Sequence, residues 1–179
     1  MIMKLFSQLL FLLLLSAGYA SAQVIESNEY SIKAAFVYNF LKFVKWPESV
    51  FTSKDQSLQL CILEPSPFER SSFVSKEGSL IQGRQLDVNF IESMSDASSC
   101  HALFVSSAWG DMLPRIVGDS KLSHTLTISD IENFSANGGM IEFVEVNNRI
   151  RFKIHLDSAK SADLQISSRL LFLAQEIYK

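Results

Sequence analysis

Apolar residues dominate the segment from Lys33 to Pro47, KAAFVYNFLKFVKWP, which is the most distinctive part of the chain. Its polar residues are Lys33, Asn39, Lys42 and Lys45. On a helix these four residues lie on different faces, so no continuous polar face forms. The segment is too short and too charged to span a bilayer. We predict a helix over Asn28–Val44, capped by Ser27 or Asn28 and stopped before Pro47, that is covered on most sides.

The middle of the chain alternates short apolar runs with stretches of helical character. The predicted strands are Leu58–Leu63, Leu86–Ile91, His101–Ser106 and Thr125–Ile128. A helix is expected over Pro67–Lys76, with Phe68 and Phe73 inward, and another over Ala108–Val117, interrupted by Pro114. Strands that alternate with helices indicate an α/β layer with right-handed crossovers.

The pattern changes after Asn137-Gly138-Gly139, a strong turn signal. Met140–Val146 and Arg149–Leu156 flank Asn147-Asn148, which predicts a two-residue hairpin turn. That register sets Phe143 opposite Phe152, Glu142 opposite Lys153 and Glu145 opposite Ile150. The second strand alternates Ile150, Phe152, Ile154 and Leu156 inward with Arg149, Arg151, Lys153 and His155 outward.

A short turn over Asp157–Ala162 and a final helix over Ser167–Ile177 complete the predicted elements. The inward stripe of that helix is Leu170, Leu173, Ala174 and Ile177. The predicted fold is a single α/β domain with a mixed, mostly parallel sheet, flanking helices and a C-terminal antiparallel hairpin.

The N-terminus carries an export signal. Lys4 precedes the apolar run Leu5–Leu15, and Ala20-Ser21-Ala22 is a small-x-small cleavage site. We predict a signal peptide over residues 1–22 and one periplasmic domain over 23–179, with a retained N-terminal anchor as the alternative. The net charge of −3, without a basic block, argues against nucleic acid as a partner. No later run is long and apolar enough to enter a membrane.

Cys61 and Cys100 are the only two cysteines of the chain. In an exported protein an isolated pair is most simply a disulfide. Free thiols are a second reading. Redox catalysis is a third, although it usually needs a CxxC motif or another activated thiol, which this spacing does not offer.

The sequence contains no pattern that predicts catalysis. His101, His124 and His155 lack a second ligand at helical or strand spacing, so no metal is predicted. Ser106-Ser107 lacks a glycine elbow, and Gly138-Gly139 precedes a strand, unlike a phosphate-binding loop. We therefore expect a protein that is not an enzyme and needs no cofactor.

Three segments resemble the YfiR family of periplasmic proteins. They are KAAFVYNFLKFVKWP at Lys33–Pro47, CHALFVS at Cys100–Ser106, and the long segment Leu126–Leu171 with its GGMI and RIRFKI core. They occur in family order. The resemblance implies an exported α/β domain that tends to dimerise, and it places Cys61 and Cys100 at a disulfide position of the family. A second cysteine pair found in some members is missing here, which removes the basis for redox control through it.

The resemblance also implies a function. Such proteins hold an inner-membrane diguanylate cyclase of the YfiN type inactive by contacting its periplasmic part, and an outer-membrane lipoprotein of the YfiB type sequesters the repressor. The output is cyclic di-GMP and hence biofilm growth. The alternative is a periplasmic small-ligand-binding module, with a crevice at the carboxyl ends of the strands.

Two groups of residues are candidates for the partner contact. They are Tyr38, Phe40, Lys42, Phe43 and Trp46 on the first helix, and Arg149, Arg151 and Lys153 on the hairpin. The simpler interpretation of the aromatic residues is core packing, and that of the basic residues is a solvated face.

Overall fold

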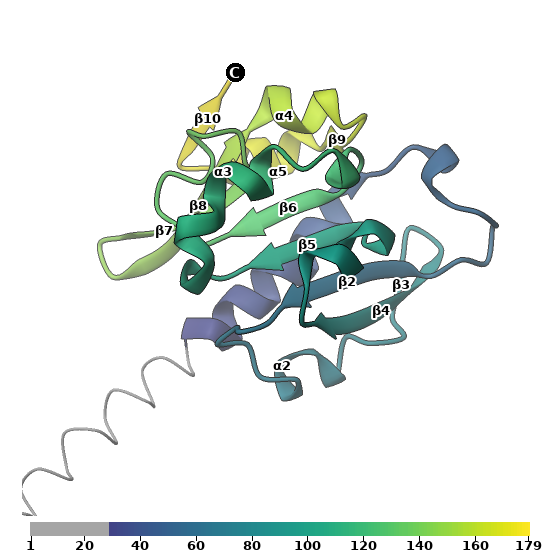
Figure 1. Ribbon diagram of the computed structural model, residues 1–179. Coiled ribbons are helices and arrows are strands. Elements are labelled where there is room, and N and C mark those ends of the chain that lie inside the picture. The colour runs from purple at the N-terminus through teal and green to yellow at the C-terminus, as the bar shows by residue number, and fades with distance from the viewer. Residues whose placement is uncertain (1–28) are drawn as a thin grey trace, which may run out of the picture.

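The computed structural model describes residues 29–179, in which an eight-stranded sheet is the central element (Figure 1). Its strands are β2 (Leu58–Leu63), β3 (Leu80–Ile81), β4 (Arg84–Ile91), β5 (Ala102–Val105), β6 (Leu126–Ser129), β7 (Ile141–Val146), β8 (Arg149–His155) and β10 (Glu176–Tyr178). The order across the sheet is β10-β8-β7-β6-β5-β2-β4-β3. Only β7–β8 and β3–β4 pair antiparallel among these strands. The predicted α/β class is confirmed.

The predicted strands are confirmed, with small shifts at their ends. β2 has the predicted bounds, and β4, β5 and β6 differ from the prediction by one or two residues at an end. All four residues of β5 are buried, as expected for a central strand covered on both faces. The short edge strand β3 was not predicted; it lies between Gly78 and Gly83, and glycines at such spacing are typical of loops.

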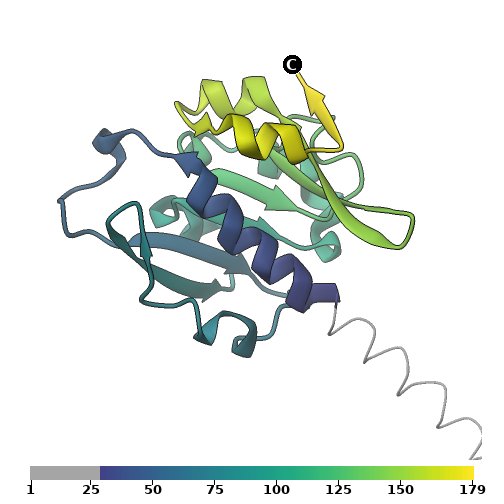
Figure 2. The ribbon, with the colours of Figure 1, turned by 180° about the vertical axis from the view of Figure 1, so that it is seen from behind.

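Helices lie on both faces of the sheet. A helix covering residues 29–43 and α5 (Ser168–Leu173) lie on the face seen in Figure 2. The 3-10 helices η2 (Met94–Ser99), η3 (Ser107–Met112) and η4 (Ser120–Leu122), together with α3 (Leu113–Val117), lie on the face seen in Figure 1. Each face has its own apolar cluster, one containing Phe40 and Phe104, the other Leu103 and Phe134.

The N-terminal helix is covered by its own domain, which confirms the expected burial. Val37, Phe40 and Leu41 have no exposed surface. The Phe40 ring lies 5.6 Å from that of Phe143 and 4.9 Å from that of Phe152. Such aromatic pairs add to the free energy gained by burying apolar area. The predicted signal peptide and the predicted cap at Ser27 or Asn28 lie outside the described residues.

Lys33 is a polar residue that the helix buries. It is 4% exposed, and its ammonium group lies 2.6 Å from the carboxylates of both Glu29 and Asp130. Asp130 also accepts hydrogen bonds from the Tyr30 hydroxyl and the Ser107 amide. Because a buried charge is costly unless it is paired, this network fixes the helix against the end of β6.

The hairpin forms in the predicted register. Phe143 lies opposite Phe152, Glu142 opposite Lys153, and Glu145 opposite Ile150. Asn147 and Asn148 have φ values of 53° and 56°. Positive φ at both central residues is the geometry of the turn that favours tight hairpins, and asparagine tolerates it.

Three predicted elements were wrong in extent or type. The helix over Pro67–Lys76 is reduced to α2 (Ser71–Val74), although Phe68 and Phe73 are buried as expected. Pro114 does not interrupt a helix: it stands in the first turn of α3, where its missing N–H costs nothing. The expected turn after the hairpin is a helix, α4 (Leu156–Ser161).

The predicted C-terminal helix is the largest correction. α5 ends at Leu173, and the chain then adds β10 to the sheet, parallel to β8. Leu170 is buried, but Leu173 is 59% exposed and Ile177 is 39% exposed, so the predicted inward stripe does not exist. A second, two-stranded sheet was also not predicted: β1 (Val44–Lys45) pairs with β9 (Gln165–Ile166).

Candidate interaction surface

The aromatic candidates on the first helix fall into two groups. Phe40 has no exposed surface, and Trp46 is 8% exposed and donates a hydrogen bond from Nε1 to the His101 carbonyl at 2.9 Å. These two residues belong to the core and offer almost no surface to a partner. They are therefore removed from the predicted contact set.

Tyr38, Lys42 and Phe43 remain at the surface to different degrees. Tyr38 and Phe43 are half-buried and pack against the core cluster. Lys42 is exposed, and its Nζ lies 5.2 Å from the centroid of the Tyr38 ring, close enough for a cation–π contact. This part of the helix offers one charge and two partly exposed aromatic rings to a partner.

The basic residues on the outward face of β8 differ in whether they form ion pairs. Lys153 forms an ion pair with Glu176 of β10 at 3.1 Å. The hydrogen bond between them raises the pKa of Lys153 and lowers the pKa of Glu176. Arg149 and Arg151 are exposed and form no ion pair with any described residue. These two arginines are therefore the positive charges on this strand face that are available to a partner.

An open hollow with a volume of about 510 Å³ lies between the hairpin and the start of the N-terminal helix. The hairpin projects beyond the neighbouring strands (Figure 1). We call the lining residues the hairpin surface: Glu29, Ile32, Glu145, Asn148, Arg149, Ile150 and Arg151. Ile32 is 43% exposed, so apolar area lies beside charges of both signs. At this hollow the first helix meets the hairpin through residues other than the predicted aromatic ones, whereas Phe40 joins the same two elements within the core.

The strand at this hollow has an open edge. β10 pairs with β8 only from Lys153 to His155, and the Gln175 amide donates to the Phe152 carbonyl at 2.8 Å. The stretch from Arg149 to Arg151 has no neighbouring strand on that side within the described sheet. Unpaired backbone groups at an edge can accept an extended segment of another protein.

Part of this surface was missed in the sequence. Ile32 and Glu29 were assigned only to the first helix, and the hollow depends on how that helix lies against the hairpin. The alternation along β8 did identify Arg149 and Arg151 as outward residues. The turn signal at Asn147-Asn148 was the available indication that this region projects.

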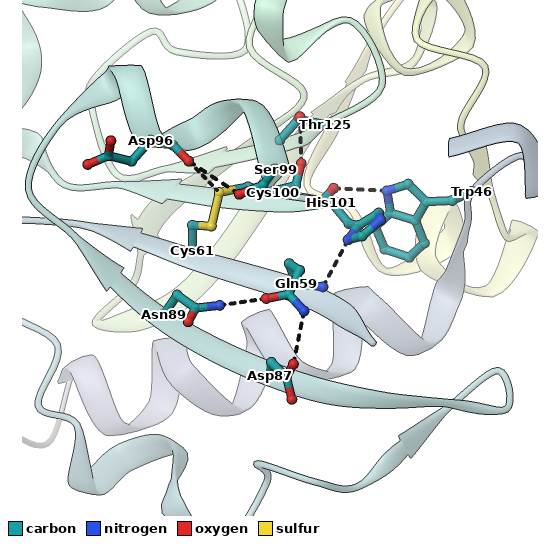
Figure 3. The surroundings of a disulfide bond; sticks show 10 residues. All are labelled: Trp46, Gln59, Cys61, Asp87, Asn89, Asp96, Ser99, Cys100, His101 and Thr125. Carbon is teal, nitrogen blue, oxygen red and sulfur yellow. Dashed lines mark hydrogen bonds between the residues drawn. A yellow bond between two sulfur atoms is a disulfide. The ribbon is translucent and has the colours of Figure 1, made fainter. Parts of the chain in front are cut away.

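The two cysteines form a disulfide, with 5.8 Å between their Cα atoms (Figure 3). It joins β2 to Cys100, which lies two residues before the neighbouring strand β5. Beside it, burial lowers the pKa of His101 from 6.5 to about 4, and the nearby Arg84 guanidinium adds to this effect. The His101 imidazole is therefore neutral at neutral pH.

Groups that could carry chemistry are sparse in the described part of the chain. Residues 29–179 contain no group of three or more His, Cys, Asp or Glu placed to hold a metal ion. Glu142 is a buried carboxylate, and it accepts hydrogen bonds from the backbone of Asn133 and Ser135, which fixes the loop before β7. A hollow of about 250 Å³ lies at the carboxyl ends of β4 and β5, below the usual size of a small-molecule site.

No helix within residues 29–179 combines the length and the apolar character needed to cross a bilayer. The fold and the site define a mixed α/β domain with one disulfide, a projecting hairpin and an open strand edge. The chain belongs to the YfiR/HmsC-like family, whose model matches residues 30–175. This family is regulatory rather than catalytic, and it indicates a periplasmic regulator of cyclic di-GMP signalling. A search of curated proteins gave no match.

Proposed function

We propose that this protein is a periplasmic repressor that holds an inner-membrane diguanylate cyclase of the YfiN type inactive by binding its periplasmic part. Sequestration by an outer-membrane lipoprotein of the YfiB type would release the cyclase. The observation that carries the proposal is the family match, which extends over nearly all of the described chain. The proposed output is a lower level of cyclic di-GMP and less biofilm.

Inhibition by binding needs no catalytic residue. A repressor must bind the inactive state of its target more tightly than the active state, and that difference in affinity sets how far the equilibrium moves. The hairpin surface supports such a contact because it combines exposed apolar area, two unpaired arginines and an open strand edge. We assign the cyclase contact to this surface.

A homodimer is part of the same proposal. Phe172 is 89% exposed and lies beside Leu173, which is 59% exposed, on α5. Exposed apolar residues in a cluster are typical of protein–protein interfaces. The pair lies near β10, at the sheet edge that carries the hairpin.

Deletion of the gene tests the repressor role. Cyclic di-GMP, measured by mass spectrometry in cell extracts, is expected to rise on deletion and to return to the original level when the wild-type gene is restored. An unchanged level after deletion would refute repression. The protein must be detected by immunoblot in each restored strain, so that loss of protein is not mistaken for loss of function.

Two double variants test whether the hairpin surface makes the contact, separately from whether the protein is a repressor. The double variant Arg149→Ala/Arg151→Ala should fail to lower cyclic di-GMP although it accumulates normally. The matched control is Lys45→Ala/Arg115→Ala, which removes two exposed cations outside the hairpin surface and should repress fully. Full repression by the hairpin variant would reject this surface and leave the repressor function standing.

A further inference from the structure

A second hollow, of about 570 Å³, lies at the amino ends of the parallel strands. Three segments line it, which precede β2, β5 and β6, and the first of them is the stretch that follows the N-terminal helix. The hairpin surface lies beyond the carboxyl end of β7, which runs parallel to β6, so the two sites are at opposite ends of the sheet. The volume is within the usual range of small-molecule sites.

The lining of this hollow is polar and rich in hydrogen-bond donors. Ser49, Ser98 and Ser123 contribute hydroxyl groups that have no hydrogen-bond partner among residues 29–179. Ser99, Cys100, His101 and Thr125 lie together at one side, where the disulfide anchors the chain (Figure 3). Hydroxyl groups donate and accept hydrogen bonds, so they suit an oxygen-rich ligand.

The charge of the lining is positive. Lys121 and His124 are lining residues, and no aspartate or glutamate is among them. Lys121 is exposed and forms no ion pair within the described chain. The acidic group nearest His124 is Asp163, at 3.7 Å from Nδ1, and this nitrogen also lies 3.0 Å from the Ala162 carbonyl. The lysine ammonium is therefore free to pair with an anion.

His101 supplies a fixed donor at the same hollow. It is 5% exposed, and its Nδ1 accepts a hydrogen bond from the Gln59 amide at 2.9 Å. The neutral ring therefore carries its proton on Nε2, which has no hydrogen-bond partner in the described residues. Phe51 stacks on the ring at 4.5 Å, and the Arg84 guanidinium lies 3.6 Å from the Phe51 centroid. This stack holds the imidazole in one orientation.

We propose that this hollow binds a small organic anion bearing a phosphate or carboxylate group. The acid group pairs with Lys121, and the Nε2–H of His101 and the serine hydroxyls hydrogen-bond the ligand oxygens. Charge-assisted hydrogen bonds of this kind are the strong ones in proteins. The proposal does not rest on the repressor function, because its residues are separate from the hairpin surface.

Titration followed by NMR tests the site directly. Inorganic phosphate, glucose 6-phosphate and citrate are added separately to the disulfide-intact domain, with glucose as the uncharged control. We expect at least one anion, and not glucose, to shift the amide signals of residues 98–101 and 121–125. A response to the phosphates alone identifies a phosphate site, and a response to citrate alone identifies a carboxylate site. Binding with a dissociation constant of roughly 10 mM is the weakest affinity of interest. If no anion at roughly 10 mM shifts these amide signals, the proposal is overturned.

A lysine variant separates this site from non-specific anion binding. Lys121→Met should weaken the binding of the responding anion about tenfold, since a hydrogen bond to a charged group contributes of that order. Lys45→Met, which removes an exposed lysine outside the hollow, should leave the affinity unchanged. Equal affinity in the wild type and Lys121→Met, or equal losses in both variants, would contradict the assignment.

Discussion

Acidification is predicted to weaken this fold through the imidazole of His101. The ring is 5% exposed, and its pKa is lowered from 6.5 to about 4, chiefly by burial. Because the folded pKa is depressed, the unfolded chain takes up the proton first as the pH falls. The stability contributed by the neutral ring is intact above pH 6.5 and is lost progressively as the pH falls towards 4.

The size of the effect follows from the two pKa values. Each pH unit between the folded and unfolded pKa corresponds to about 1.4 kcal/mol. The difference between 6.5 and about 4 therefore gives a loss of roughly 3 kcal/mol in the free energy of unfolding. For a domain of this size, such a loss is a large fraction of the usual total.

Urea unfolding at pH steps from 7.5 to 4 measures this loss. His101→Gln is the informative variant, since its amide oxygen can still accept the Gln59 N–H but does not titrate. The wild type should lose about 3 kcal/mol more than this variant over the window. His124→Gln, which removes an exposed imidazole, serves as the control and should follow the wild type. Parallel stability curves for the wild type and His101→Gln, with an NMR-measured pKa of His101 near 6.5, would refute the reasoning.

Two further predictions concern packing and assembly. A Cβ added at Gly139 would overlap the buried Phe134 ring, so Gly139→Ala should lower the free energy of unfolding by about 3 kcal/mol or prevent folding. Gly110→Ala, where no atom lies within 4 Å, should change it by less than about 1 kcal/mol, and similar losses in both variants would contradict the packing. Phe172→Ser should convert the proposed dimer to a monomer in light scattering, and a monomeric wild type would refute the dimer.

The hairpin shows where sequence reasoning succeeds. Its strand alternates with period two, and a two-residue turn joins it to its partner. Since a one-residue slip would move every side chain to the other face, alternation and turn length together leave one register. The facing pair Phe143 and Phe152 therefore follows from the order of residues alone.

The C-terminus shows where sequence reasoning fails. Leu170, Leu173 and Ile177 have helical spacing, yet only Leu170 is buried. The chain leaves the helix because β8 offers an unpaired edge, and the backbone bonds of β10 satisfy it. Such a tertiary contact overrides a local pattern of weak helical preference. Nothing within the last ten residues shows that this edge is near.

The candidate site also contains some residues whose position the sequence predicts and others whose position it does not. The outward positions of Arg149 and Arg151 follow from alternation along one strand, and they are exposed. The burial of Phe40 and Trp46 depends on which elements cover the first helix, and local periodicity does not contain that information. The hollow at the amino ends of the strands is assembled from three separate segments, so no single motif indicates it.

The contact of the first helix with the hairpin has a consequence for the order of folding. Phe40 packs on Phe152, and the strand after the helix pairs with residues near the C-terminus. A chain made from its N-terminus therefore presents its most apolar helix long before the strands that cover it exist. The core on this face can close only after almost all of the chain has been synthesised. Until then the helix is a natural target for chaperones, and shortening the chain at its C-terminus would expose residues from its beginning.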